Sequence, residues 1–222
     1  MRRCFVKAGL ILSISAAAYS NAARADDCTI GVEAACAHAN LASAELAGAQ
    51  LDRANFEKAN LNGADLSNAT LRSARLAGAS LLGSNLTKAD LGGADLSGAA
   101  LHKANLENAS LEGANLRHAH LNGAVLNGAN LTRSDLRGAD LPLAQLRGAQ
   151  LQHSRLRSAI LLGADLRDAD ATGADFSYSA LRRADLSGAI LKDAIFTGAD
   201  MRGCIGCPAP AGAPVKKRQK SH

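Results

Sequence analysis

The sequence predicts an all-β repeat fold in which the chain turns once in every five residues. From Leu41 to Met201 every fifth residue is apolar, and no insertion interrupts the 33 positions. The residue two places before each of them is always Ala or Ser. Sixteen of the 21 glycines lie two places after one of them, where a tight turn often requires positive φ. These observations predict one small unit repeated many times.

A period of five excludes the two ordinary alternatives. In an α-helix five residues advance by about 500°, so the apolar residues would spread around the cylinder and form no stripe. A strand alternates its side chains with a period of two, and five is odd, so any strand must end within each unit. The composition agrees, because 47% of the 222 residues are apolar while only 3% are aromatic. Such a core consists mainly of Ala and Leu instead of the mixed side chains of a globular core.

Units such as Ala64-Asp65-Leu66-Ser67-Asn68 and Ala114-Asn115-Leu116 follow the pattern Ala-(Asp/Asn)-Leu-x-x. This pattern resembles the pentapeptide-repeat family over roughly residues 39–203. The resemblance implies a right-handed, four-sided β-solenoid with 20 residues per coil and about eight coils. It also implies that the central Leu and the preceding Ala point inward, while the other three residues point outward. At about 4.8 Å per coil the rod would be about 40 Å long.

With 20 residues per coil, Ala171 and Phe176 fall in the same coil. Ala171 is the only small residue among the central positions, and Phe176 occupies the next central position along the chain. Phe56 and Phe196 fall on the same side as Phe176. We expect the ring of Phe176 to fill part of the space that Ala171 leaves, because a void would lower stability.

Residues 1–25 have the three parts of a secretory signal peptide. A short basic segment, Met1–Lys7, precedes twelve apolar residues, 8–19, and the small-x-small sequence Ala23-Arg24-Ala25 precedes Asp26. The apolar segment is short for a bilayer span, although an uncleaved anchor is the alternative. Residues 2–7 also resemble a twin-arginine signal. We therefore expect a periplasmic or secreted protein that uses either the general secretory or the twin-arginine route.

Both ends of the repeat contain a pair of cysteines. We predict two local disulfides, Cys28–Cys36 and Cys204–Cys207, because an even number of cysteines remains in an oxidising compartment. A bridge between the ends is excluded, since bridged Cα atoms lie within about 7 Å. The expected divisions are an N-terminal cap (26–38), the solenoid (39–203), and a C-terminal cap with a disordered basic tail (204–222). A redox role for Cys204 and Cys207 is the alternative to a cap.

The formal charge of +5 comes from the two ends of the chain. Without residues 1–25 and the basic tail the body is near −3, so it lacks a broad field for attracting nucleic acid. The tail itself could contact an anionic membrane or an envelope polymer.

One side of the expected rod carries charged residues in columns. Arg117, Arg137 and Arg157 stack on consecutive coils, and Asp95, Asp135 and Asp175 stand two positions earlier in their repeats. This arrangement is either an anion-binding stripe or a lattice of Arg–Asp pairs that neutralise one another.

A second side carries unusual apolar residues that could form a partner or dimer contact. These are Leu82, Pro142, Leu143, Ile160 and Leu162. Ile190 and Ile195 replace the usual polar residue near the C-terminal end, where they could pack under the cap or join two rods end to end. Isolated apolar residues on a surface are also normal.

Catalytic motifs are missing from the sequence. It contains no nucleophile elbow and no phosphate-binding glycine loop. We expect no enzymatic activity, no cofactor and no metal, although His102, His118 and His120 lie near one another on the expected rod.

We therefore expect an exported scaffold that binds an unidentified protein partner or itself. The alternative is a cytoplasmic topoisomerase-binding protein that mimics DNA, as some members of the resembled family do. That role needs a strongly acidic rod and no signal peptide.

Overall fold

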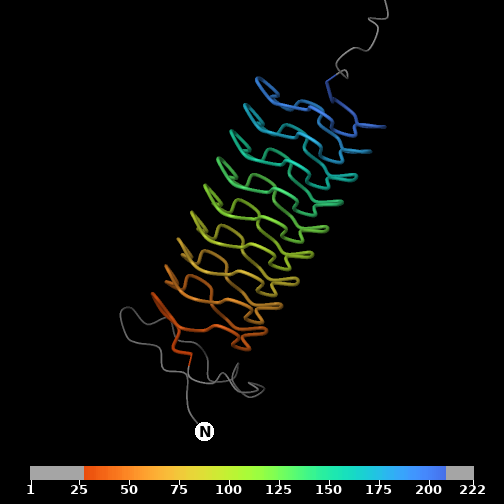
Figure 1. Cartoon of the computed structure of the whole chain (residues 1–222). Coiled ribbons are helices and arrows are strands. Elements are labelled where there is room, and N and C mark those ends of the chain that lie inside the picture. Colours follow the sequence, from red (N-terminus) through yellow and green to blue (C-terminus); the bar gives the residue numbers. More distant parts are fainter. Residues whose placement is uncertain (1–27, 209–222) are drawn as a thin grey trace, which may run out of the picture.

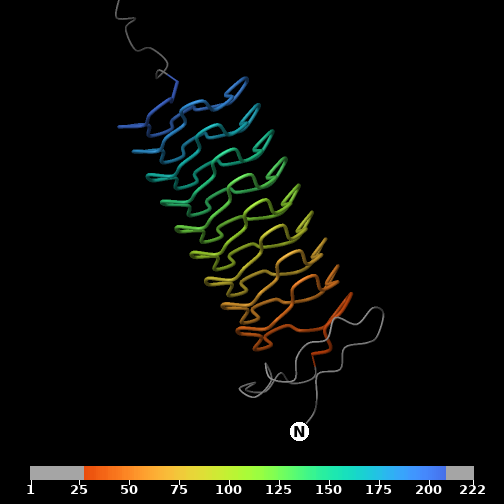
Figure 2. The same ribbon diagram turned by 180° about the vertical axis from the view of Figure 1, so that it is seen from behind.

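The structure, a computed structural model, describes residues 28–208, which form a right-handed β-solenoid. Figures 1 and 2 show a straight rod of stacked coils, with the first described residues (red) at one end of the rod and the last (blue) at the other. Thirty-one parallel bridges hold it together, from Ala35–Asn55 to Asp185–Ile205. Each bridge joins a residue to the one twenty places later, so each coil has 20 residues and four sides. The four-sided fold predicted from the resemblance is confirmed.

We name the four sides by their bridged residues. Face A has the bridged residues 35, 55 and so on to 195; face B has 40 to 200, face C 45 to 205, and face D 50 to 190. In each repeat the bridged residue is followed by an inward residue and by two turn residues, which we assign to the same face. Each strand is a single bridged residue, and no helix occurs between residues 28 and 208.

Hydrogen bonds between coils use three of the five backbone N–H groups in each repeat. Asn60 N–H donates to Ala39 O of the coil below (2.8 Å), and Leu61 N–H donates to Ser80 O of the coil above (2.7 Å). Gly63 N–H also donates to the coil above. The fourth N–H closes the turn, from Ala64 to Leu61 O (3.1 Å).

The fifth N–H belongs to the first turn residue, and in many repeats an Asn or Asp side chain accepts its hydrogen bond. Asn62 N–H donates to Asn60 Oδ1 at 3.1 Å, and the same bond recurs along the rod. This bond explains why Asn or Asp precedes the central residue in about half of the repeats, since both side chains readily accept a hydrogen bond from the backbone two residues on. Where the bridged residue is Ser80, Leu82 N–H instead donates to Asn62 Oδ1 of the coil below. Pro142 occupies this same turn position and has no N–H to satisfy.

The second turn residue has positive φ in every repeat from Glu33 to Gly203. Positive φ was predicted at the sixteen glycines, but nineteen other residues, among them Leu143 and Tyr178, share it. The corner of the coil imposes this conformation whatever the side chain, although it is less favourable for residues with a Cβ.

The inward residues fill the interior completely between residues 51 and 186. Every central side chain there is at most 1% exposed, Ala171 and Phe176 included. Serine replaces inward alanine without loss at Ser84, whose hydroxyl donates to Leu81 O at 2.8 Å. In the last coil Leu191, Phe196 and Met201 are only half-buried. The ring of Phe196 stacks on Phe176 at 5.0 Å.

The solenoid pattern already begins within the segment expected to form the N-terminal cap. Residues 31–38 show the turn-and-bridge pattern, and Cys36 occupies an inward position of face A. The expected signal peptide and most of the basic tail lie outside the described residues. The described residues contain no helix that is long and apolar enough to cross a membrane.

We predict that Ala171 and Phe176 are coupled. Ala171→Leu alone should lower the free energy of unfolding by about 1–3 kcal/mol, because it overfills the coil beside the phenyl ring. Ala171→Leu combined with Phe176→Leu should recover much of this loss. Leu151→Ala, one coil away on the same face, is the control for a plain cavity and should cost about 2–5 kcal/mol. Urea denaturation measures all three variants against wild type, and a stabilising Ala171→Leu would contradict the coupling.

Candidate interaction surface

Each end of the described rod is closed by a disulfide. Cys28 is bonded to Cys36 with their Cα atoms 4.8 Å apart, and Cys204 to Cys207 at 5.8 Å. Cys28 and Cys36 are buried beneath the first coil, whereas Cys204 and Cys207 are half-buried at the last. The disulfides therefore tie down the two places where a solenoid lacks a neighbouring coil.

The three stacked arginines of face A differ in their partners. Arg137 Nε lies 2.8 Å from Asp135 Oδ1 in a two-pronged ion pair. Arg157 lies over the ring of Tyr178, 4.7 Å from its centroid. Neither Arg117 nor Arg157 pairs with a carboxylate within residues 28–208. The lattice interpretation thus holds for one arginine of the three.

Most carboxylates of the same columns accept hydrogen bonds from backbone N–H groups. Asp95 and Asp175 accept hydrogen bonds from the N–H groups of Ser97 and Ser177. The hydrogen bond from Arg137 lowers the pKa of Asp135 below its usual value, and burial opposes this effect only in part. Asp135 is therefore ionised and occupied by Arg137, whereas Arg117 and Arg157 remain available to an anion.

The apolar side predicted as an interface is face B, which carries Leu82, Pro142, Leu143, Ile160 and Leu162. Leu143 is 70% exposed and Leu82 48%, whereas Leu162 is 37% exposed. Ile160 is also exposed and Pro142 is half-buried. Leu82 lies several coils away from the other four, so the structure groups Pro142, Leu143, Ile160 and Leu162 alone.

The C-terminal end presents a second apolar surface. Ile190 and Ile195 are exposed in the last coil, on faces D and A, and Ile205 stands in the same position on face C. No residue up to Pro208 packs over Ile190 and Ile195. In more than half of the other repeats the bridged position holds Asn or Asp instead of Ile. Ile205 could have been found from the sequence by extending the repeat by one unit.

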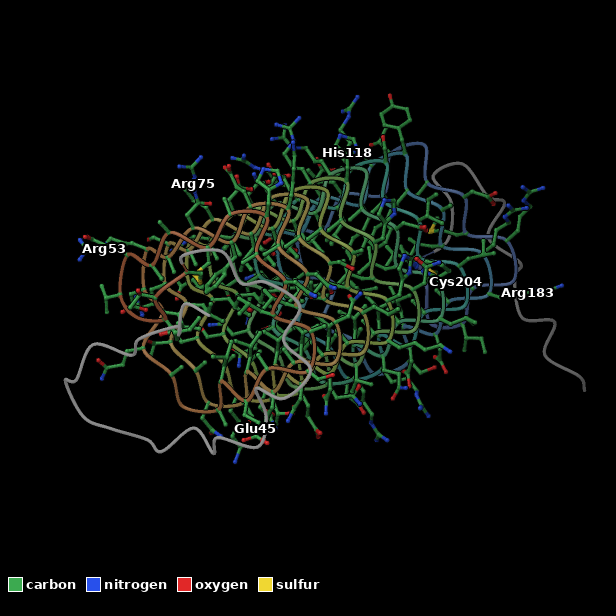
Figure 3. All side chains as sticks on the ribbon, turned by 90° about the horizontal axis from the view of Figure 1, so that it is seen from below. Glu45, Arg53, Arg75, His118, Arg183 and Cys204 are labelled. Atoms are coloured by element: carbon green, nitrogen blue, oxygen red, sulfur yellow. A yellow bond between two sulfur atoms is a disulfide. The ribbon has the colours of Figure 1, made fainter. Side chains whose placement is uncertain are left out.

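The near-neutral body charge conceals a separation of charge between faces. Faces A and B together carry ten basic and six acidic side chains, whereas faces C and D carry seven basic and eleven acidic ones. Figure 3 shows His118 of face A and Glu45 of face C projecting from opposite sides of the rod. The sequence prediction of a weak field missed this dipole, because a total charge does not show which residues share a side.

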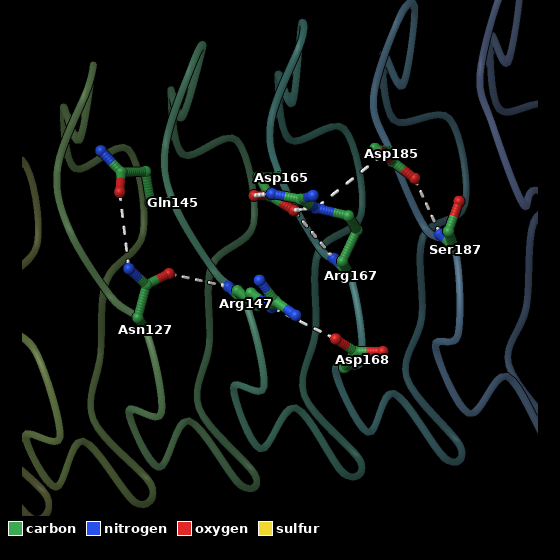
Figure 4. A network of polar contacts seen from close by, with 8 residues as sticks. All are labelled: Asn127, Gln145, Arg147, Asp165, Arg167, Asp168, Asp185 and Ser187. Carbon is green, nitrogen blue, oxygen red and sulfur yellow. Dashed lines mark hydrogen bonds and ion pairs between the residues drawn. The ribbon is translucent and has the colours of Figure 1, made fainter.

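Face C neutralises its own arginines. Arg147 Nε lies 3.2 Å from Asp168 Oδ2, and Arg167 binds Asp165 and lies 3.9 Å from Asp185 (Figure 4). The hydrogen bond from Arg167 lowers the pKa of Asp165. Both arginines of this network are therefore occupied, unlike Arg117 and Arg157 on face A.

Two of the three neighbouring histidines, His102 and His120, stack on consecutive coils. The rings of His102 and His120 lie 5.7 Å apart and nearly parallel, and His120 Nδ1 is 3.9 Å from Asp140. Within residues 28–208 no three His, Cys, Asp or Glu side chains are grouped to hold a metal ion.

Comparison with known proteins identifies the repeat. The family model described as pentapeptide repeats matches residues 34–72, 64–102, 104–142, 144–177 and 172–205. The solved structure of HetL, a pentapeptide repeat protein involved in heterocyst differentiation regulation in the cyanobacterium Nostoc sp. strain PCC 7120, is 36% identical. That match covers 75% of this chain and 89% of HetL, with a TM-score of 0.41.

Two further solved structures are similar. Rfr23 from the cyanobacterium Cyanothece 51142 is 29% identical over 41% of this chain and 63% of its own, with a TM-score of 0.40. QnrB1, a plasmid-mediated fluoroquinolone resistance protein, is 22% identical over 72% of this chain and 87% of its own, with a TM-score of 0.44. The search of curated protein sequences found no match.

We predict that Arg137→Gln raises the pKa of Asp135 towards its ordinary value of 3.8, since the hydrogen bond from Arg137 is the main cause of the lowering. A carboxyl group with a lowered pKa adds stability above its unfolded-state pKa, and this stability is lost as pH falls through the folded pKa. The variant should therefore lose less stability than wild type on acidification below about pH 4. Carboxyl-carbon NMR titration measures the pKa, with Arg157→Gln as the control, because Arg157 does not contribute to the lowering. An unchanged pKa would show that Arg137 is free to bind an anion.

Proposed function

The chain belongs to the pentapeptide-repeat family, and on that premise we propose that it is an exported, non-enzymatic rod that presents a rigid binding or scaffold surface in the cell envelope. The observation that carries this proposal is the unbroken 20-residue register from residue 35 to residue 205. Because each coil bonds to the next, outward side chains stand at fixed, regular spacings on flat faces. A partner would therefore meet a preformed surface and lose little freedom on binding.

The filled interior supports a surface function. The central side chains between residues 51 and 186 are at most 1% exposed, so the interior of the coils does not open to solvent there. Ligand sites in enzymes are usually concave and partly apolar, whereas the chemistry of this rod lies on convex corners and flat faces. Proteins of this family are generally binding or structural proteins.

The two disulfides support export. Disulfides persist in oxidising compartments and are rare in the cytosol. Both form between cysteines close in sequence, at the ends of a rod that follows the expected signal peptide. Residues 1–25 themselves rest on the sequence prediction alone.

The charge distribution disfavours the alternative function as a topoisomerase-binding mimic of DNA. A DNA mimic should be acidic along the surface that enters the enzyme, because duplex DNA carries regularly spaced negative charge. Here two adjacent faces carry an excess of basic side chains. QnrB1, at 22% identity, shares the fold with this chain and supports nothing further about its partner.

Fractionation tests export and separates the two functions. We expect the protein in the periplasm or medium, with a mature N-terminus at Asp26 found by N-terminal sequencing. Mass spectrometry of unreduced peptides should show both disulfides. A full-length, uncleaved chain in the cytosol with four free thiols would overturn the envelope role and favour the alternative.

Self-association through the C-terminal end is a second test of this scaffold. The exposed Ile190 and Ile195 lie beside half-buried core residues, and burying them against a second rod would remove apolar surface from water. We expect wild type to form a dimer in light scattering at high concentration, and Ile190→Asp with Ile195→Asp to remain monomeric. Val32→Asp, which alters an exposed residue at the other end, is the matched control. A monomeric wild type would exclude this contact.

A further inference from the structure

We propose that a column of arginines on face A binds a linear anionic polysaccharide whose sugars carry carboxylate groups. The column contains Arg117, Arg137 and Arg157, with Arg155 beside it and Tyr178 at its C-terminal end. We name these five residues the arginine stripe. The proposal rests on the proposed function and deepens it, since it names the envelope component that the rod would bind.

All five residues of the arginine stripe stand on face A of consecutive coils. Arg155 is a bridged residue of that face. Arg117, Arg137 and Arg157 are each the first turn residue of their coil, and Tyr178 is the second turn residue of the coil that follows. The guanidinium of Arg157 lies 4.7 Å from the centroid of the Tyr178 ring, which shows that side chains of neighbouring coils meet here. The stripe therefore runs straight along the rod, with about 4.8 Å between coils.

The arginine stripe holds most of the arginines that lack a carboxylate partner. Of the thirteen arginines between residues 28 and 208, nine form an ion pair with another described residue. Three of the remaining four are Arg117, Arg155 and Arg157. In contrast, all five arginines of faces C and D are paired. The unpaired guanidinium groups are thus concentrated on one face, where they can bind an external anion.

Charge is also unevenly distributed along face A. Between residues 115 and 178 this face carries four arginines and two aspartates, whereas between residues 35 and 98 it carries two basic and two acidic side chains. Both aspartates of the first region are already engaged. Asp135 is bound by Arg137, and Asp175 accepts the N–H of Ser177. A local positive field therefore remains at the stripe, and it attracts anions.

The pair formed by Arg137 and Asp135 shows how a carboxylate binds at this position of the repeat. Arg137 Nε lies 2.8 Å from Asp135 Oδ1, and Nη2 donates to Oδ2. Two parallel hydrogen bonds of this kind are the geometry in which a planar guanidinium recognises a carboxylate. Arg117 and Arg157 occupy the same position one coil away on either side, and they can hold a ligand carboxylate in the same way.

The spacing of the unpaired arginines fits a polysaccharide. The distance between coils, about 4.8 Å, is close to the length of one sugar in an extended β-1,4-linked chain. Alternate sugars of such a chain face opposite ways, so the carboxylates on one side recur at every second sugar. Arg117 and Arg157 are two coils apart, or about 10 Å. They can therefore bind two successive carboxylates on the same side of the chain.

Other anionic partners match the stripe less well. The phosphates of duplex DNA follow one another at about 3.4 Å along each strand. Acidic side chains on one side of an extended peptide recur at about 7 Å, because alternate residues point opposite ways. A bilayer surface is usually bound through aliphatic as well as basic side chains, and face A carries no exposed aliphatic side chain between residues 115 and 178.

Tyr178 provides a surface on which a sugar ring can stack. Its ring contacts Arg157 of the preceding coil and lies against Gly198 of the next, where a Cβ would come within 2.7 Å of the ring. The residue is nevertheless 54% exposed, and its positive φ is unfavourable for a residue with a Cβ. An exposed aromatic ring offers an apolar face to the C–H groups of a sugar, and residues in such backbone conformations concentrate at functional sites.

Binding of a defined oligosaccharide tests the proposal. The probes are a hexasaccharide of β-1,4-linked glucuronic acid and cellohexaose, which is the same chain with hydroxymethyl groups in place of the carboxylates. Calorimetry with the chain from Asp26 to His222 should detect binding of the charged hexasaccharide, weakened by salt, and no binding of cellohexaose. Shorter glucuronic acid chains should bind more weakly, because they cannot span the three coil spacings, about 14 Å, from Arg117 to Tyr178.

The arginines have a matched control on face C. Arg117→Gln with Arg157→Gln should lower the affinity for the charged hexasaccharide by about tenfold or more, because hydrogen bonds between charged groups are strong. Arg147→Gln with Arg167→Gln removes the same charge from the same repeat positions, where aspartates hold both side chains. This control should change the affinity by less than about twofold, since only screened long-range attraction is lost.

The aromatic ring and the tail are tested separately. Tyr178→Ala should weaken binding, whereas Tyr178→Phe, which keeps the ring, should preserve it. All the substituted side chains are exposed, and circular dichroism melts show whether each variant folds. The comparisons are repeated with Gln at all four basic residues of the tail, so that the tail cannot mask the stripe. These are Lys216, Lys217, Arg218 and Lys220.

Each of three results would overturn the proposal: no binding of the charged hexasaccharide by wild type, equal binding by the Arg117 and Arg157 variant, or an equal loss in the face C control. Tighter binding of a DNA duplex or of phosphatidylglycerol vesicles, lost in the same stripe variant, would assign the stripe to phosphate groups and also overturn it. The assay uses purified protein and does not depend on export. A cytosolic location would therefore refute the proposed function and leave this result intact.

Discussion

The backbone hydrogen bonds between successive coils are the constraint on which the rest of the structure depends. Leu61 N–H bonds to Ser80 O above it, and the same bond recurs with a step of nineteen residues along the rod. Because each coil bonds to the one before it, four five-residue units must complete one coil of 20 residues with the register unchanged. This requirement fixes a small residue and a large apolar residue inside and a turn at each corner, and it favours an Asn or Asp that bonds the one N–H that the coils leave over.

Because the backbone satisfies itself, the side chains of the outer faces are free to differ. Face C uses this freedom to neutralise its arginines with Asp165 and Asp168, while face A leaves Arg155 and Arg157 unpaired. Surface ion pairs of this kind contribute little to stability, so the difference between the faces is better understood as a difference in what they can bind. Leu143 is likewise better understood as a binding residue, because it is exposed and has a positive φ that is unfavourable for a residue with a Cβ.

At each end of the rod a coil lacks a neighbouring coil to bond to, and the two ends differ in the side chains that lie there. Cys28 and Cys36 are buried under the first coil, whereas the last coil leaves Leu191 and Phe196 half-buried beside exposed isoleucines. The rod is therefore asymmetric along its axis as well as around it. Self-association would use the C-terminal end of the rod, where apolar side chains are exposed.

By itself the sequence determined the repeat, its inward residues, the turns at glycine and the pairing of the cysteines. These features are local or strictly periodic, and a period can be counted along a chain. Four-sided closure came from the resemblance, and only the tertiary structure decided what each face presents. Arg157 and Tyr178 are twenty-one residues apart, and they meet because the coil brings them to one corner. The charge dipole and the grouping of Leu143 with Leu162 depend on the same register, since a neutral total conceals any arrangement around a rod.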